Sequence, residues 1–440
     1  MLNWKTTSNG TTALLIEGAR RIGKSYIVEK FAHNEYKTAI IVDFNDMQPE
    51  LKEIFDNYLN KRDDFFMRLS LYFGVKLFER ESVIVFDEVQ QYPKARAAIK
   101  YLVKDGKYDY IETGSLISIK KNVKDIVIPS EEEHLEMYPM DFEEFMWALG
   151  DEMYMDFLRD CYQSKKTLGG LLRRGMDYFR LYMVIGGMPQ AVAQYVATKD
   201  FEQTDNIKRN ILRLYREDIA KYAFEAETKV TRIFDEIPSQ LQKHEKKFRL
   251  AALSGNAKMR DYEDAFFWLD DAKIVNICYN STEPNIGLKL NTDRTTLKCY
   301  FCDTGLLISA TFDKETILRE QLYKKLILDK LEFNKGMLVE NLVAQMFKAN
   351  GHNLYFFSTS HKEAENRMEI DFLLSKKSVT SRHNIIPIEV KSTSQYAHVS
   401  IDKLRKKYSD YLDTPIVLHP GELKQSNGIL YLPVCMAGVV

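Results

Sequence analysis

The chain has 440 residues, of which 45% are hydrophobic and 28% charged, and its formal net charge is −1. This length and composition fit an ordinary folded protein of about three domains. The near-zero net charge excludes nucleic-acid binding through an overall basic surface, so any such binding must come from local patches. Five scattered cysteines, no leader pattern and no apolar run near the ~20 residues that span a bilayer predict a cytoplasmic protein without membrane association.

The first 150 residues alternate short apolar runs with amphipathic segments. We expect strands at residues 13–16, 38–44, 83–87, 108–113 and 135–138, and helices at 25–33, 50–58, 64–78 and 94–104. This alternation predicts an α/β fold, a parallel sheet covered by helices, with ligands bound at the carboxyl ends of the strands.

A glycine-rich loop lies between the first predicted strand and the first predicted helix. It fits the pattern G-x-x-x-x-G-K-[ST], and its residues are Gly18, Ala19, Arg20, Arg21, Ile22, Gly23, Lys24 and Ser25. The glycines let backbone N–H groups face phosphate oxygens, and the following helix N-terminus adds partial positive charge. We expect Lys24 to reach the β- and γ-phosphates of a nucleotide and the Ser25 hydroxyl to bind Mg²⁺.

Two carboxylates follow the apolar run at residues 83–87. Asp87 suits the Mg²⁺ shell, and Glu88 suits polarising a water for attack on the γ-phosphate. Ser115, at the tip of the next predicted strand, should lie close to the same phosphate. A glycine turn or an acidic strand end can each arise by chance. Because the two motifs occur together and in the right order, they predict an ATP-binding and ATP-hydrolysing protein that uses Mg²⁺.

The middle of the chain is predicted to hold a helical lid at 151–225 and a winged helix with a connecting helix at 226–330. Arg209 and Arg213 project from one helix face, where they either approach the nucleotide or pair with Glu217 and Asp218 in solvent. The winged-helix outline rests on two helices and a hairpin, and it is compatible with binding nucleic acid or protein. Its basic residues are Lys243, Lys246, Lys247, Arg249, Lys258 and Arg260. The C-x-x-C pair Cys299 and Cys302 alternates with aromatic residues, which favours a buried strand over a metal or redox site.

Residues 331–440 carry a second group of chemical residues. Glu340 lies on an amphipathic helix, Asp371 and Glu389 lie on two predicted strands, and Lys391 follows Glu389 on the same strand face. If the strands pair, Asp371 and Glu389 could hold a divalent ion while Lys391 offsets phosphoryl charge, which is the chemistry of a nuclease. The alternative is a pair of half-buried strands with charges at their edges.

Taken together, these motifs resemble a large prokaryotic family of AAA-superfamily ATPases fused to a DUF4143 domain. Further matching segments are Tyr138–Phe145, Gly186–Pro189 and Asp303–Leu307. The resemblance implies a sheet order of 5-1-4-3-2, a helical lid, a winged helix and a restriction-endonuclease-like C-terminal domain of the PD-(D/E)xK type. It also implies cleavage roles for Asp371, Glu389 and Lys391, with Glu340 on the first helix. The sequence departs from the pattern at 369–372, where Glu-Ile-Asp-Phe replaces the Pro-Asp motif.

Two functions are compatible with these residues. The first is an Mg²⁺-dependent ATPase coupled to nucleic-acid processing, with DNA favoured over RNA. The second is a nucleotide-gated switch or scaffold whose C-terminal domain binds protein or nucleic acid without cleaving it. The sequence leaves the oligomeric state open, and a homo-oligomer is compatible with it.

Overall fold

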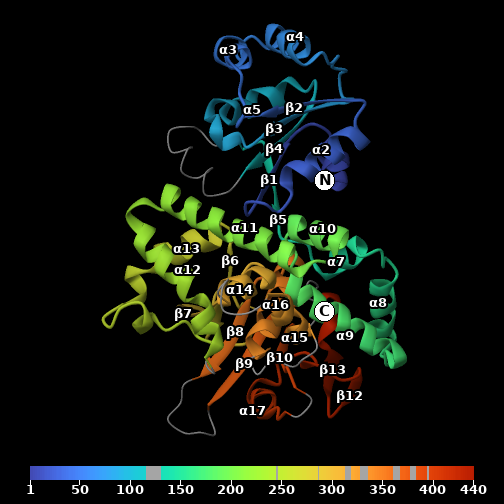
Figure 1. Ribbon diagram of the computed structural model, residues 1–440, viewed down its shortest axis with the longest axis vertical. Coiled ribbons are helices and arrows are strands. Elements are labelled where there is room, and N and C mark those ends of the chain that lie inside the picture. The colour runs from blue at the N-terminus through green and yellow to red at the C-terminus, as the bar shows by residue number, and fades with distance from the viewer. Residues whose placement is uncertain are drawn as a thin grey trace. The chain divides into compact units, whose positions relative to one another are not determined.

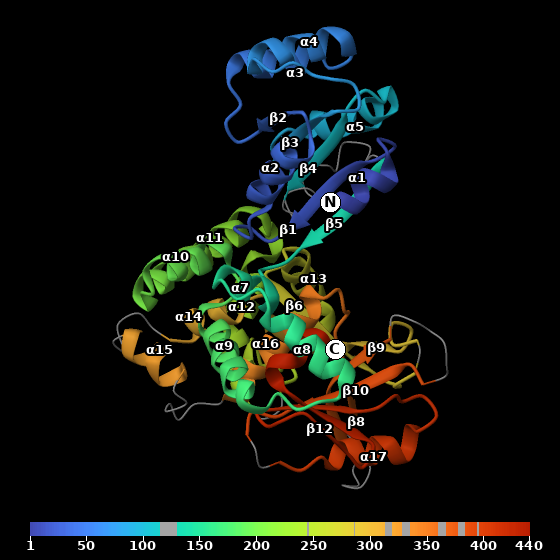
Figure 2. The same ribbon diagram turned by 90° about the vertical axis from the view of Figure 1, so that its right-hand side faces the viewer.

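The computed structural model describes residues 1–114, 130–243, 246–285, 287–312, 319–327, 335–359, 367–376, 383–393 and 396–440. The chain divides into two compact units, Met1–Met137 and Tyr138–Val440 (Figures 1 and 2). Among the helices of these residues, none combines the length and the apolar character that crossing a membrane requires.

The first unit is a parallel five-stranded sheet with helices on both faces. Its strands are β1 (Ala13–Gly18), β2 (Thr38–Asp43), β3 (Ser82–Asp87), β4 (Asp109–Gly114) and β5 (Glu132–Met137). Its helices are α1 (Leu2–Ser8), α2 (Lys24–Glu35), α3 (Pro49–Tyr58), α4 (Arg62–Phe73) and α5 (Pro93–Asp105). The strand order is β2-β3-β4-β1-β5, which confirms the order implied by the resemblance.

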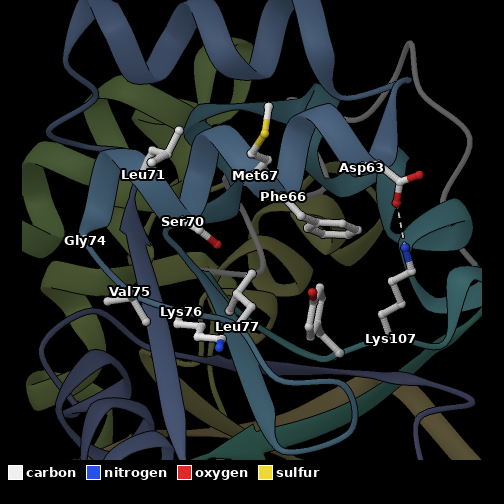
Figure 3. A pocket seen from close by; sticks show the side chains of 11 residues that line it. Asp63, Phe66, Met67, Ser70, Leu71, Gly74, Val75, Lys76, Leu77 and Lys107 are labelled. Carbon is white, nitrogen blue, oxygen red and sulfur yellow. Dashed lines mark hydrogen bonds and ion pairs between the residues drawn. The ribbon is translucent and has the colours of Figure 1, made fainter.

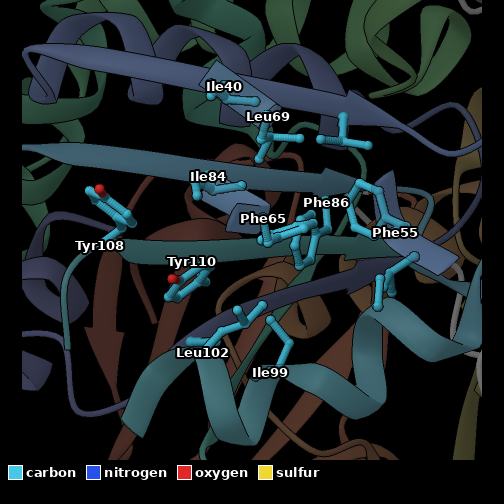
Figure 4. Packing of buried hydrophobic residues seen from close by; sticks show 14 of the residues in the cluster. Ile40, Phe55, Phe65, Leu69, Ile84, Phe86, Ile99, Leu102, Tyr108 and Tyr110 are labelled. Carbon is cyan, nitrogen blue, oxygen red and sulfur yellow. The ribbon is translucent and has the colours of Figure 1, made fainter. Parts of the chain in front are cut away.

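Alternating side chains divide this sheet into two apolar faces, as the two-residue period of a strand requires. Figure 4 shows one face, where Ile84 and Phe86 of β3 pack with Phe55 of α3 and Ile99 of α5. On the other face, Val85 belongs to a cluster with residues of α1 and α2. Both faces are therefore buried, and the strand ends are left to carry polar side chains.

The second unit contains a mixed eight-stranded sheet and the remaining described helices. The sheet order is β12-β13-β11-β10-β9-β8-β6-β7. The strands are β6 (Val275–Ser281), β7 (Thr292–Phe301), β8 (Tyr355–Thr359), β9 (Met368–Ser375), β10 (Ile385–Val390), β11 (Ile416–His419), β12 (Lys424–Ser426) and β13 (Ile429–Pro433). The helices are α7 (Phe142–Ala148), α8 (Tyr154–Ser164), α9 (Leu172–Ile185), α10 (Pro189–Thr198), α11 (Phe201–Tyr222), α12 (Glu227–Gln242), α13 (Glu263–Asp271), α14 (Thr304–Thr311), α15 (Arg319–Ile327), α16 (Lys335–Ala349) and α17 (Val399–Tyr408).

The hairpin expected in the winged helix forms, but it belongs to this larger sheet. β6 pairs antiparallel with β7 and, on its other side, parallel with β8. A wing extends from its own small module, whereas this hairpin is continuous with the strands of the C-terminal region. The prediction of a separate winged-helix module is therefore not confirmed.

The three further segments of the family resemblance meet inside the second unit. The Met140 N–H donates to the Gly187 carbonyl at 2.8 Å, and the Gly187 N–H donates to Oδ2 of Asp303 at 2.5 Å. A Cβ at Gly187 would lie 2.1 Å from the Met140 carbonyl oxygen, so this contact requires glycine. These segments are therefore held together by hydrogen bonds of the Gly187 backbone with Met140 and with the Asp303 carboxylate.

Candidate functional site

The glycine-rich loop connects β1 to α2, as the motif requires. A Cβ at Gly18 would lie 2.3 Å from the Met137 carbonyl oxygen, and Gly23 has φ 91° where α2 begins. Arg21 also has a positive φ, of 70°. The Lys24 ammonium is buried and donates to the Ala19 carbonyl at 2.9 Å and to the Gly18 carbonyl at 3.2 Å. The lysine thus lies over the loop that is expected to bind phosphate.

Asp87 joins the loop to the neighbouring strands. The Ser25 hydroxyl donates to Oδ1 of Asp87 at 2.9 Å, and the Thr113 hydroxyl hydrogen-bonds the same oxygen. The Glu88 N–H in turn donates to the Thr113 oxygen at 3.1 Å. Glu88 has φ 56°, and its carboxylate accepts a hydrogen bond from Gln90. The side chains of Ser25, Asp87 and Thr113 and the backbone of Glu88 are therefore linked directly.

This arrangement fits a magnesium ion bound together with nucleotide phosphates. A hydroxyl and a carboxylate in contact are hard oxygen ligands, and Mg²⁺ is usually held in proteins by one or two such groups plus phosphate oxygens and water. Ser25 and Asp87 supply the two groups. Thr113, which fixes Asp87, was not selected from the sequence, although its place at the end of a predicted strand is the signal that could have found it. Ser115 lies outside the described residues.

The same sheet contains two acidic residues with buried side chains, Glu112 of β4 and Glu132 of β5. Glu112 of β4 is fully buried, and burial followed by the nearby Glu132 charge raises its pKa well above the ordinary value. Arg96 of α5 pairs with Glu132 at 2.8 Å. Burial thus favours the neutral form of Glu112, and the negative charge of Glu132 is compensated by Arg96.

The first unit also contains a cavity of about 510 Å³, whose lining side chains are drawn in Figure 3. It is lined by Phe66, Met67 and Leu71 of α4 and by Leu77 and Tyr108, which precede β3 and β4. The cavity therefore lies toward the amino ends of those strands, whereas the loop, Asp87 and Thr113 lie at carboxyl ends. It is not the site of the predicted nucleotide.

The two arginines of the predicted lid have partners within the second unit. Nε of Arg209 donates to Asp205 at 2.6 Å, and its Nη2 donates to the Phe312 carbonyl at 2.7 Å. Arg213 pairs with Glu217 at 2.6 Å along α11. The sequence left two interpretations of this helix face, an approach to the nucleotide and pairing with acidic residues. For Arg213 the structure shows pairing, with Glu217 as the partner.

The predicted nuclease residues converge beneath α16. β9 and β10 are antiparallel neighbours, with Ile388 opposite Phe372, and Oδ2 of Asp371 accepts the Val390 N–H at 2.9 Å. Glu389 and Lys391 pair at 2.7 Å. Burial raises the pKa of both Asp371 and Glu389. The strand pairing thus brings Asp371 next to Glu389, as the sequence predicted.

Two lysines that were not assigned to this site also reach it. Glu340 accepts Lys298 at 3.2 Å and the Tyr300 hydroxyl at 2.5 Å, and it is also paired with Lys246. Burial alone would raise the pKa of Glu340, but the Lys246 and Lys298 charges lower it to about 2. Lys298 also contacts Asp371, at 3.6 Å. The signal that could have found Lys298 is a lysine inside an otherwise apolar and aromatic strand.

Three of the basic residues of the middle region lie close to carboxylates of the second unit. Lys246 faces Glu340, Lys247 lies 3.8 Å from Glu369, and Lys243 lies 3.9 Å from Glu236. The basic residues whose pattern is compatible with phosphate contacts are in part the counter-ions of carboxylates within the second unit. Nucleic-acid binding stays a prediction.

Comparison with known families identifies the parts of the chain. An AAA domain matches residues 10–146, and a domain of unknown function, DUF4143, matches residues 335–435. The chain is an AAA domain fused to a DUF4143 domain. Another domain of unknown function, DUF8612, matches residues 176–316 of this AAA–DUF4143 protein. The AAA match indicates an ATPase-type function. No curated protein matches the chain.

Two solved structures show a distant likeness to the chain. The chain is similar to a Signal Transduction ATPase with Numerous Domains (STAND) protein with a tetratricopeptide repeat sensor from Pyrococcus horikoshii, with 10% identity, a TM-score of 0.27 and coverage of 79% of this chain. It spans about half of that protein (47%). It is also similar to the Hef helicase domain of Pyrococcus furiosus, with 11% identity, a TM-score of 0.17 and coverage of 94% of this chain and 87% of the other. At these TM-scores neither likeness carries weight for function.

Proposed function

We propose that this AAA–DUF4143 protein binds ATP and hydrolyses it with the help of Mg²⁺ at the carboxyl ends of β1, β3 and β4. The observation that carries the proposal is the meeting of three motifs at one carboxylate. Ser25 from the glycine-rich loop and Thr113 from β4 both hydrogen-bond Asp87 of β3. A chance glycine turn would have no reason to be linked in this way to an acidic strand end.

Each residue has a distinct task in this proposal. Lys24 binds the β- and γ-phosphates as a point charge, and the backbone N–H groups of the loop surround them. Ser25 and Asp87 would hold Mg²⁺, which offsets phosphate charge when bound. Glu88 orients the attacking water and accepts its proton. Thr113 fixes Asp87 through its hydroxyl and the backbone of Glu88 through its oxygen.

Phosphate release by the purified chain tests this function. Wild-type protein should release phosphate from ATP with Mg²⁺ and stop when EDTA is added. Lys24→Ala should weaken ATP binding by about tenfold or more, because charge-assisted bonds contribute about 1.5–3 kcal/mol each. Lys30→Ala is the matched control, since Lys30 is an exposed lysine of the same helix. Equal ATP affinity in both variants would refute the assignment of the loop.

For the C-terminal region, we favour a nucleotide-gated switch that binds a partner without cleaving it. The supporting observation is that the carboxylates expected to hold a metal are paired with lysines. Incubation of the protein with single- and double-stranded DNA and RNA, Mg²⁺ or Mn²⁺, and ATP should give no products that depend on Asp371. Products that are absent with Asp371→Ala would restore the nuclease function.

A further inference from the structure

We propose that Lys298 takes the place of the divalent cation that a PD-(D/E)xK site would hold, so that the C-terminal carboxylates form a closed internal ion cluster. The cluster consists of four carboxylates and four ammonium groups, namely Glu340, Glu369, Asp371, Glu389, Lys246, Lys247, Lys298 and Lys391. This inference concerns the second unit alone and does not depend on ATP hydrolysis.

The position of the Lys298 ammonium is the first observation. Its Nζ lies 3.2 Å from Oε1 of Glu340, 3.2 Å from Oε1 of Glu369 and 3.6 Å from Oδ1 of Asp371. A magnesium ion would need carboxylate oxygens at about 2.0–2.1 Å around the same centre. Because the ammonium already lies among these three groups, a metal ion and Lys298 cannot share the position.

The carboxylate oxygens are also engaged individually. Both oxygens of Glu340 have partners, since Oε1 accepts Lys298 and Tyr300 while Oε2 pairs with Lys246. Oδ2 of Asp371 accepts the Val390 N–H at 2.9 Å. Each of these bonds already occupies a lone pair that a metal ion could use, so the bonds compete with metal binding. Within the part of the chain that the structure describes, no group of three or more Asp, Glu, His or Cys side chains is arranged to hold a metal.

Charge balance gives an independent reason. With all eight groups ionised, four negative and four positive charges sum to zero. A divalent cation added to this set would leave two excess positive charges in a largely buried place. Lys298 is itself fully buried, so it cannot turn into solvent to make room for the ion.

Three of the four lysines come from a different segment of the chain than the carboxylates, and Lys391 is the exception. Lys246 and Lys298 lie within the DUF8612 match, whereas Glu340, Asp371 and Glu389 lie within the DUF4143 match. β7, which carries Lys298, belongs to the same sheet as β9 and β10. The preceding segment therefore supplies the cation for the acidic residues of the following one, and the two are joined by this cluster.

Manganese binding to the nucleotide-free full-length chain tests the inference. Titration calorimetry and Mn²⁺ paramagnetic resonance would compare wild type, Asp371→Asn, Lys298→Met and Lys298→Met combined with Asp371→Asn. Lys289→Met is the matched control, because Lys289 is an exposed lysine that precedes β7. Weak binding at Ser25 and Asp87 of the first unit is common to all variants and does not depend on Asp371.

In wild type and in Lys289→Met, we expect no Mn²⁺ site that depends on Asp371. Lys298→Met should gain one site per chain, at least about tenfold tighter than any C-terminal site in wild type, and the double variant should lose it. Mn²⁺ should also raise the melting temperature of Lys298→Met and not that of wild type. If Lys298→Met does not fold, the comparison of wild type with Asp371→Asn decides alone. The inference is overturned by an Asp371-dependent Mn²⁺ site in wild type, or by a folded Lys298→Met that gains none.

Discussion

Thr113 offers a sharp test of the proposed ATP site, because its hydroxyl bonds both Asp87, the last residue of β3, and the backbone of Glu88, which follows it. The hydroxyl hydrogen-bonds Asp87, and its oxygen accepts the Glu88 N–H at 3.1 Å. Thr113→Val keeps the shape of this buried side chain and removes both bonds. A hydrogen bond to a charged group contributes about 1.5–3 kcal/mol, and if all of it is lost in the transition state, turnover should fall by about 10- to 150-fold.

The assay separates turnover from binding. Phosphate release with Mg²⁺ should fall as stated, whereas ATP affinity in EDTA should change by less than about threefold, because Lys24 and the loop are untouched. Thr38→Val is the matched control, since Thr38 of β2 bonds the Lys76 carbonyl at 2.9 Å, at the amino end of its strand. Turnover of Thr113→Val close to that of Thr38→Val would refute the role of Thr113. An equal loss of ATP affinity in EDTA would point to a folding defect.

The other predictions concern metal dependence, packing and pH. Asp87→Asn should keep ATP binding in EDTA and lose the gain in affinity from added Mg²⁺, which titration calorimetry measures; an unchanged gain would remove Asp87 from the metal shell. Gly18→Ala should lower the free energy of unfolding by about 2 kcal/mol or more, because its methyl would lie 2.3 Å from the Met137 carbonyl oxygen. In the control Gly170→Ala, the methyl meets nothing within 4 Å, so thermal denaturation should show no such loss of stability. Lys208 donates to the Val184 carbonyl at 2.8 Å, and burial lowers its pKa from 10.5 to about 8. Between these two pH values the unfolded chain binds more protons at this lysine than the folded chain does. The lysine should therefore make the free energy of unfolding rise by up to about 3 kcal/mol from pH 8 to pH 10.5. Chemical denaturation of Lys208→Met should show a smaller rise, and a rise identical to that of wild type would contradict the prediction.

The first unit could be predicted from the sequence because its signals are local. The strands β1, β2 and β3 are short apolar runs, and the loop and the acidic strand end are contiguous motifs. The strand β5 is mostly polar, and it begins three residues before its predicted start at residue 135. One predicted helix end, that of α4, differs from the structure, and the cause is also local. The helix predicted at 64–78 ends at Phe73, because Gly74 adopts φ 65° and its N–H caps the preceding turn.

The second unit was harder to predict because its important contacts join distant residues. Lys298 and Glu340 are 42 residues apart, and hydrophobic periodicity carries no information about such a pair. The hairpin of β6 and β7 was expected, but its pairing with β8 depends on a partner strand more than 70 residues further along the chain. The placement of Asp371 beside Glu389 could be predicted, since alternation and hairpin pairing are regular.

ATP turnover by Glu88→Gln tests the central claim most directly. Glutamine keeps the shape of Glu88 but cannot accept a proton from the attacking water, so Glu88→Gln should bind ATP with wild-type affinity and convert it at least about 100-fold more slowly in a single-turnover assay with Mg²⁺. Wild-type protein should convert the bound ATP to ADP and phosphate. Turnover of Glu88→Gln at the wild-type rate, or a wild-type protein that binds ATP with Mg²⁺ and releases no phosphate, would contradict the account.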